Sequence, residues 1–197
     1  MPRKLLRCWN TKNPLYTRYH DEEWGVPVHD DTKLFELLTL EGFQAGLTWE
    51  LILKRREALK NAFADFNPKV LAEFGETDAQ DIRNKPGVIR NKAKINAAIK
   101  NAQILLQIQN EFGSFNKFIW KFVNGKPLDH ALKAMSDMPA ETDESRSMSK
   151  ELKKRGFKFV GPVICYAFMQ AVGMVNDHLT SCFRYKQIQK TNKTHIQ

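Results

Sequence analysis

Apolar residues in this sequence recur at the spacing of an α-helix and almost nowhere at that of a β-strand. Within 90–110, Ile95, Ile99, Ala102 and Leu106 follow the i, i+4, i+7 pattern of one helix face. No stretch alternates apolar and polar residues for long enough to indicate a strand. The sequence therefore predicts an all-α fold with about eight to ten short helices.

The same signals indicate further helices along the chain. They cover Thr32–Gln44, Trp49–Phe66, Phe115–Val123 and part of the apolar stretch Phe157–Val175. Asp30 or Asp31 is the N-cap candidate of the first, and Pro162 suits the first turn of the last. Because Lys158 and Gln170 interrupt the apolar stretch, we expect a buried helix there rather than a membrane span.

Two segments lack helical periodicity. Ala140–Lys150 is polar and rich in turn-forming residues, which predicts a surface connection. The end of the chain, 185–197, is polar and basic, which predicts a disordered tail. We therefore expect a single domain over residues 1–184, followed by this basic tail.

Charge and composition narrow the class of protein. The 197 residues include 31 Lys and Arg against 22 Asp and Glu, a net charge of +9 that favours a polyanionic partner, most simply nucleic acid. With 42% hydrophobic and 27% charged residues, the chain is typical neither of disordered nor of membrane proteins. Three cysteines argue against a disulfide scaffold, and no apolar run typical of a signal peptide follows Met1. We expect a cytoplasmic protein.

Two pairs of potential metal ligands lie near opposite ends of the chain. Cys8 and His20 are twelve positions apart, while His178 and Cys182 stand four apart, which on a helix gives them one face. Two thiolates and two imidazoles suit tetrahedral zinc with no open position, so such a site would be structural. Spacing alone leaves a second interpretation open, in which these are surface histidines and inert buried thiols. Cys165, inside an apolar helix, is expected in the core.

A basic segment surrounds a Pro-Gly turn. The stretch 82–110 contains six Lys and Arg residues and no acidic residue. Its turn and following helix suggest a phosphate clamp in which Gly87 brings the backbone close to DNA and Arg90, Lys92 and Lys94 neutralise phosphates. An ordinary turn followed by a solvated basic helix remains the alternative.

Aromatic residues and one carboxylate form a third group of candidates. Tyr16, Tyr19 and Trp24 fall within a few residues of one another, and Glu41 lies among apolar and glycine neighbours shortly before Trp49. A desolvated carboxylate can be tuned for hydrogen bonding or proton transfer, and aromatic rings can stack on a planar base. A purely structural group of core aromatics and a solvated glutamate is the alternative.

Taken together, these segments closely resemble the 3-methyladenine DNA glycosylase I family, a bacterial branch of the helix-hairpin-helix DNA glycosylases. The matching stretches run in order along nearly the whole chain: Cys8–Trp9, Asn13–Tyr16, Tyr19–Pro27, Leu40–Gly42, Gln44–Leu47 with Trp49, Gly87–Arg90, Lys94–Ile95, Asn101–Ala102, Lys153–Gly161, Met169–Ala171 and Val175–His178. The resemblance implies hydrolysis of the N-glycosidic bond of 3-methyladenine in alkylated double-stranded DNA. The target base would be flipped out and an abasic site left behind.

The resemblance also implies roles for the candidate residues. Glu41 matches a pocket carboxylate that accepts hydrogen bonds from the base. The residues matching the walls of that pocket are Trp49 as the stacking ring, Tyr16 and Tyr19 as completing aromatics, and Trp24 as support. Leu47 is a candidate wedge that fills the gap left by the flipped base.

Finally, the resemblance implies a helix-hairpin-helix lobe over about 32–110 and a second lobe built from both termini. One structural zinc would bind Cys8, His20, His178 and Cys182, and no organic cofactor, membrane or obligate protein partner is expected for this monomer. No Asp occurs between Asp81 and Asp129, where many relatives of the superfamily carry a catalytic one, so the group that activates water stays unassigned. The alternative is a non-catalytic, zinc-stapled protein that binds damaged DNA.

Overall fold

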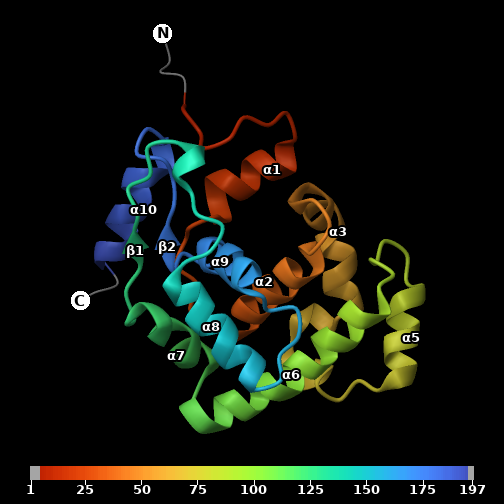
Figure 1. Ribbon diagram of the computed structural model, residues 1–197. Coiled ribbons are helices and arrows are strands. Elements are labelled where there is room, and N and C mark those ends of the chain that lie inside the picture. Colours follow the sequence, from red (N-terminus) through yellow and green to blue (C-terminus); the bar gives the residue numbers. More distant parts are fainter. Residues whose placement is uncertain (1–4, 195–197) are drawn as a thin grey trace.

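The computed structural model describes residues 5–194, most of which are helical (Figure 1). The α-helices are α1 (Pro14–Arg18), α2 (Asp31–Gln44), α3 (Trp49–Ala62), α4 (Pro68–Leu71), α5 (Glu76–Asn84), α6 (Lys92–Phe112), α7 (Phe115–Trp120), α8 (Asp143–Lys154), α9 (Pro162–Ala171) and α10 (Phe183–Thr194). A π-helical turn, Tyr19–Glu23, follows α1, and 3-10 turns cover Ala64–Phe66, Lys121–Val123 and Met135–Asp137. The strands β1 (Leu128–Asp129) and β2 (Val175–Asn176) form one short parallel pair.

Short polar side chains begin most of these helices. The side chains of Asn13, Asp30, Thr48, Asn91 and Ser114 each accept a hydrogen bond from a backbone N–H in the first turn of the helix that follows. Such caps satisfy N–H groups that have no partner inside the helix. The N-cap of α2 is thus Asp30, one of the two residues predicted for it.

Helix α2 lies at the centre of the molecule and contacts α3, α6, α7 and α9 (Figure 1). Every residue from Leu34 to Phe43 is buried, because neighbours cover the helix on all sides. The polar residues Glu36, Thr39 and Glu41 are therefore buried as well. Arg56 of α3 pairs with Glu36 at 2.7 Å, which ties these two helices together.

The N-terminal segment lies beside the start of α10, although the two are far apart in the sequence (Figure 1). The backbone N–H of Phe183, at the start of α10, donates a hydrogen bond of 3.0 Å to the carbonyl of Leu6. Strand β2 pairs with β1 next to α10, with Leu128 opposite Val175 and Asp129 opposite Asn176. This arrangement brings the predicted ligand pairs of the two chain ends into one region.

The prediction of a mostly helical chain is confirmed, and two segments differ from it. The predicted disordered tail from residue 185 is wrong as far as residue 194, because α10 packs Tyr185 and Ile188 into the interior; residues 195–197 lie outside the described chain. The predicted surface connection 140–150 contains most of α8, whose inner face buries Ser145 and Ser149. Met148 is the one large apolar residue within 140–150, which is too few to show a helical period there. Among residues 5–194, no helix is long and apolar enough to cross a membrane.

Candidate functional site

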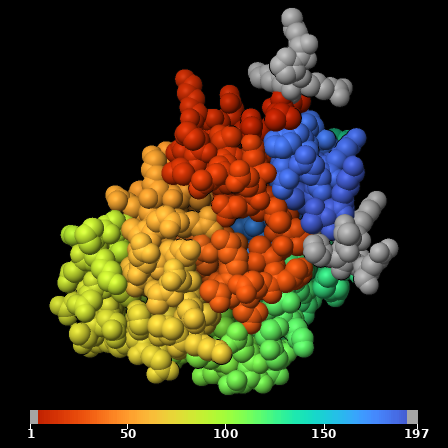
Figure 2. Space-filling view, turned by 180° about the vertical axis from the view of Figure 1, so that it is seen from behind, coloured from red at the N-terminus to blue at the C-terminus, as the bar shows by residue number. Residues whose placement is uncertain are grey.

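A cavity of about 200 Å³ opens between the N-terminal segment, α2, α3 and α9. Figure 2 shows a hollow on this face of the molecule, with the blue surface of a C-terminal segment at its floor. The cavity is lined by Trp9, Tyr16, Tyr19, Trp24, Glu41, Gln44, Trp49, Met135, Met138, Ala167 and Gln170. Tyr16, Tyr19, Trp24 and Trp49 were predicted for such a pocket. The structure places all of them around one cavity with Glu41.

Glu41 is the acidic residue of this cavity. It lies on α2 and is only 4% exposed, and no hydrogen bond or ion pair joins its carboxyl group to another described residue. Desolvation raises the pKa of Glu41 to about 8. A buried carboxylate without a partner destabilises a fold, so its presence in a cavity indicates a functional group. It is suited to receive hydrogen bonds, or a positive charge, from a ligand.

Aromatic rings form the walls around Glu41. Tyr19 is 3% exposed, and its ring centroid lies 5.3 Å from that of Trp49. Trp9 lies 5.3 Å from Tyr16 and 4.7 Å from Trp24. Burial and the nearby Glu41 raise the pKa of both tyrosines, so their hydroxyl groups remain hydrogen-bond donors at neutral pH. A flat ligand with apolar faces and polar edges would fit between these walls.

Two indole groups of this cavity carry unused donors. The Nε1 atoms of Trp9 and Trp49 are buried and have no hydrogen-bond partner in the described structure. Buried donors without partners are rare in native proteins, and they are expected where a ligand or ordered water supplies the missing acceptor. The cavity therefore combines donors and an acceptor that the protein itself does not pair.

The π-helical turn explains how neighbouring residues serve two sites. A π turn is wider than an α turn and is frequent at functional positions. Here it buries both Tyr19 and His20. Tyr19 lines the cavity, whereas His20 joins a cluster of sulfur and nitrogen ligands behind it.

That cluster contains Cys8, His20, His178 and Cys182. All four side chains are buried, and one ligand atom from each lies within 4.8 Å of the others. The Cys8 Sγ is 3.4 Å from His178 Nδ1, and the Cys182 Sγ is 3.5 Å from His20 Nε2. A hydrogen bond from Cys8, opposed by burial and aided by the two histidines, lowers the pKa of the Cys182 thiol. The structure brings all four predicted ligands together.

The second nitrogen of each histidine has its own acceptor. His20 Nδ1 lies 2.8 Å from the carboxylate of Asp21, and His178 Nε2 lies 3.0 Å from the backbone carbonyl of Trp24. Such contacts fix the ring orientation and point the other nitrogen toward the cluster, as they do around protein-bound zinc. Donor types, spacing and outer contacts therefore all fit a tetrahedral metal ion.

The aromatic wall connects the cluster to the cavity. The ring centroid of Trp24 is 4.6 Å from that of His178, and Trp9 is 4.7 Å from His20. Both tryptophans also line the cavity. The cluster and the aromatic wall of the cavity are therefore in direct contact.

The predicted phosphate clamp lies between α5 and α6. Gly87 has a φ of +80°, and a Cβ there would approach the Cβ of Ala58 to 2.8 Å, so only glycine fits this turn. Arg90 and Lys92 follow it and are exposed. The basic residues of this turn are thus accessible to a large ligand.

Lys94 does not belong to this exposed group, and the prediction that it contacts a phosphate is wrong. It is only 7% exposed. Its ammonium group donates hydrogen bonds to the backbone carbonyls of Phe43, at 2.8 Å, and Ala45, at 2.6 Å. The side chain turns inward because the end of α2 offers carbonyl groups without partners there.

Comparison with known proteins identifies the family. A sequence model described as methyladenine glycosylase matches residues 9–185. The chain belongs to the methyladenine glycosylase family. It is 47% identical over 182 residues to DNA-3-methyladenine glycosylase 1 of Escherichia coli (strain K12), a match that covers 92% of this chain and 97% of that protein. It is 45% identical to DNA-3-methyladenine glycosylase of Haemophilus influenzae, with coverages of 89% and 96%.

Solved structures agree with this family. A crystal structure of 3-methyladenine DNA glycosylase I matches with a TM-score of 0.88 at 47% identity, covering 90% of this chain and 98% of that one. A structure of 3-methyladenine DNA glycosylase I from Staphylococcus aureus, described as the structural basis of 3-methyladenine recognition, matches with a TM-score of 0.87 at 41% identity, covering 89% and 94%. The fold of this methyladenine glycosylase family member is therefore that of its relatives.

Sequence reasoning missed several residues of the cavity. They are Trp9, Gln44, Met135, Met138, Ala167 and Gln170. Gln44 lies three residues after Glu41 and so on the same helix face, a signal that could have found it. Met135 and Met138 come from the irregular segment before α8, where no helical spacing links them to the other cavity residues.

Proposed function

We propose that the protein is a monofunctional DNA-3-methyladenine glycosylase. It hydrolyses the N-glycosidic bond of 3-methyladenine in alkylated double-stranded DNA, releases the base and leaves an abasic site. The observation that carries this proposal is the unpaired, buried Glu41 inside a cavity walled by aromatic rings. The names of the relatives give the same substrate.

The lesion is cationic, and the cavity suits a cation. When the methylated base enters, Glu41 accepts hydrogen bonds from its amino edge, and the positive ring favours the ionised carboxylate. Trp49 stacks on the base, and a cation over an aromatic face gains roughly 0.5–2 kcal/mol. Tyr16 and Tyr19 complete the walls, and Trp24 supports them. Neutral adenine gains neither attraction, which gives selectivity for the charged lesion.

A base inside a duplex must be extruded before it can reach this cavity. Leu47 lies in the turn between α2 and α3, next to the cavity residues Gln44 and Trp49, and is 37% exposed. It would fill the gap that the extruded base leaves in the stack. The backbone turn at Gly87, with Arg90 and Lys92, would grip the phosphates as a helix-hairpin-helix element. This element belongs to the lobe at about 32–110, and segments from both termini form the second lobe.

For the cluster we propose one structural zinc per chain. Cys8, His20, His178 and Cys182 would hold it, and four protein ligands leave no position open for substrate or water. The metal would supply stability by joining the two ends of the chain rather than chemistry. No organic cofactor is needed, because a cationic base is already an activated leaving group. The enzyme would act as a cytoplasmic monomer on the nucleoid.

Base release tests the proposal directly. Purified protein, with no added cofactor, should release free 3-methyladenine from methylated duplex DNA, as measured by chromatography of the soluble fraction. The second candidate is a non-catalytic protein that binds damaged DNA, favoured by the same basic turn and cluster. Tight binding of the DNA without any base release would support that candidate and overturn the glycosylase.

Lys92 gives a test of the phosphate clamp. Lys92→Ala should weaken binding to duplexes of different sequence to a similar extent and reduce the slope of log Kd against log salt by about 1. Lys153→Ala, which removes an exposed charge on α8, is the matched control and should leave both unchanged. An unaltered salt slope for Lys92→Ala would place the clamp elsewhere.

A further inference from the structure

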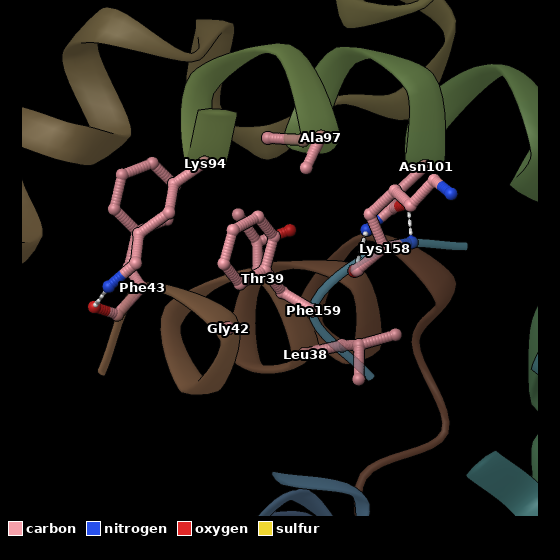
Figure 3. Close-up of a pocket in the computed structure, with 10 residues that line it drawn as sticks. Leu38, Thr39, Gly42, Phe43, Lys94, Ala97, Asn101, Lys158 and Phe159 are labelled. Carbon is pink, nitrogen blue, oxygen red and sulfur yellow. Dashed lines mark hydrogen bonds between the residues drawn. The ribbon is translucent and has the colours of Figure 1, made fainter. Parts of the chain in front are cut away.

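Lys94 is a buried cation at the junction of α6 with the end of α2. Figure 3 shows α6 passing over α2 here, with the Lys158–Phe159 segment beside them. Burial lowers the pKa of Lys94, and no carboxylate pairs with it in the described structure. Charged groups are rarely buried without a specific partner. Its hydrogen-bond partners are the two carbonyls of Phe43 and Ala45, and its ammonium also lies 6.0 Å from the centroid of the Phe159 ring.

These carbonyls stand where the negative end of the α2 dipole meets the turn to α3. The turn is short: Ala45 leaves the helix, Gly46 has a φ of +76°, Leu47 follows, and Thr48 caps α3. The N–H of Leu47 donates to the carbonyl of Gln44 at 2.6 Å. Lys94 therefore holds the turn that carries Leu47 from one side, through Ala45.

The backbone of Lys94 lies in the first turn of α6, directly after the phosphate clamp. Its backbone N–H donates to the Oδ1 of Asn91, which caps α6 directly after the exposed Arg90. Lys94 thus connects the phosphate clamp before α6 with the Leu47 turn before α3. These two surfaces would touch DNA at different places. Exposed Lys92, two positions earlier, makes no such connection to the Leu47 turn.

We infer that Lys94 is a positioning residue that fixes the Leu47 turn relative to the phosphate clamp. Lys94 is needed for base extrusion rather than for DNA affinity or for binding of the free base. The inference rests on the proposed function. Phosphate contacts would set where the duplex lies, and a Leu47 turn held at a constant distance would then meet the stack at the target base. Without the ammonium, two carbonyls lose their partner and the turn can shift.

The test separates extrusion from binding. Lys94→Met keeps the length of the side chain and removes the donors. We expect its single-turnover excision rate to fall at least tenfold, while its Kd for the duplex and its Kd for free 3-methyladenine, followed by tryptophan fluorescence, stay within threefold of wild type. Lys94→Arg, which keeps the donors, should recover most of the rate. Lys100→Met, an exposed lysine on the same helix, is the matched control and should excise as wild type does.

A double-mutant cycle of Lys94 and Leu47 tests whether both residues act on the same step. A general loss of structure would not produce the non-additive excision rates expected here. Leu47→Ala should also slow excision without changing free-base binding, and Lys94→Met combined with Leu47→Ala should be no slower than the slower single variant, because both act on one step. Additive losses would overturn the connection. Parallel loss of free-base affinity in Lys94→Met would overturn it too, since Lys94 would then support the whole cavity. If wild-type protein excises and Lys94→Met excises equally fast, this inference alone fails; if wild-type protein excises nothing, the proposed function fails as well.

Discussion

Replacing Glu41 with glutamine is expected to slow the release of 3-methyladenine by roughly 10- to 100-fold. The variant keeps the size of the side chain but removes the negative charge that faces the cationic base. A hydrogen bond to a charged group contributes about 1.5–3 kcal/mol, which corresponds to this range of rates. Affinity for duplex DNA should stay near that of wild type, because Glu41 is buried in the cavity and is not one of the exposed residues of the basic turn. Single-turnover excision and equilibrium binding measure the two quantities.

Glu57→Gln is the matched control. Glu57 is exposed on α3 and lies outside the cavity, so this variant should excise at the wild-type rate. Full activity in Glu41→Gln would remove Glu41 from the mechanism.

The same substitution should change how stability depends on pH. The folded-state pKa of Glu41, about 8, lies above the usual value of 4.5 for a free glutamate side chain. Its protonated form therefore contributes stability that is fully present below about pH 4.5 and is lost as the pH rises through 8. Glu41→Gln lacks this titration, so its stability relative to wild type should increase by roughly 3 kcal/mol between pH 5 and pH 8. Denaturant unfolding at the two pH values, without ligand, tests this, and a constant difference would contradict the burial of a free carboxyl.

Cys182→Ala is expected to have the largest effect on stability. Purified wild-type protein should contain about one zinc per chain, and the variant close to none. Loss of the metal would leave three buried ligands unpaired and would release the connection between the two chain ends. We expect a loss of at least about 3 kcal/mol, which lowers Tm by about 6–12 °C in a chain of this size. Metal analysis and thermal unfolding provide the measurements.

Cys165→Ala is the matched control for a buried thiol outside the cluster. Cys165 is fully buried in α9 and lies near the carbonyl of Val160. Its variant should keep the zinc and lose only about 1 kcal/mol. A strong chelator should lower the Tm of wild type and of Cys165→Ala but not that of Cys182→Ala. Wild-type protein that contains no zinc after mild purification would rule out the metal site.

Local sequence predicted most helices because their signals lie within a few residues of one another. The predicted helix Thr32–Gln44 matches α2 to within one residue, since both the cap Asp30 and the apolar stripe are local. The sequence does not reveal α8 and α10, because few apolar residues mark their inner faces: Met148 and Leu152 on α8, and Tyr185 and Ile188 on α10. Ser145 and Ser149 are buried on α8 by packing close to neighbouring segments. On α10, the Tyr185 hydroxyl donates to Asp129, a partner 56 positions away that no local pattern reveals.

For the candidate site too, the sequence shows some features and leaves others to contacts between distant segments. The residue types of the cavity and the cluster could be read from the chain, and the resemblance gave them roles. Lys94 was misassigned because a lysine after a basic turn has the same local pattern whether it points outward or inward. Its direction depends on the end of α2, about fifty positions earlier.

The sequence by itself determined that this chain is helical, where most helices begin, and which family it belongs to, because periodicity, caps and motifs are properties of neighbouring residues. Only the tertiary structure decided that Glu41 is buried without a partner, that Lys94 faces inward, and that the Cys and His pairs of the two ends meet. Burial, pKa and ligand geometry depend on what distant segments bring alongside a residue. That is why the chemistry of the site follows from the packing of α2 against its neighbours rather than from any one stretch of the chain.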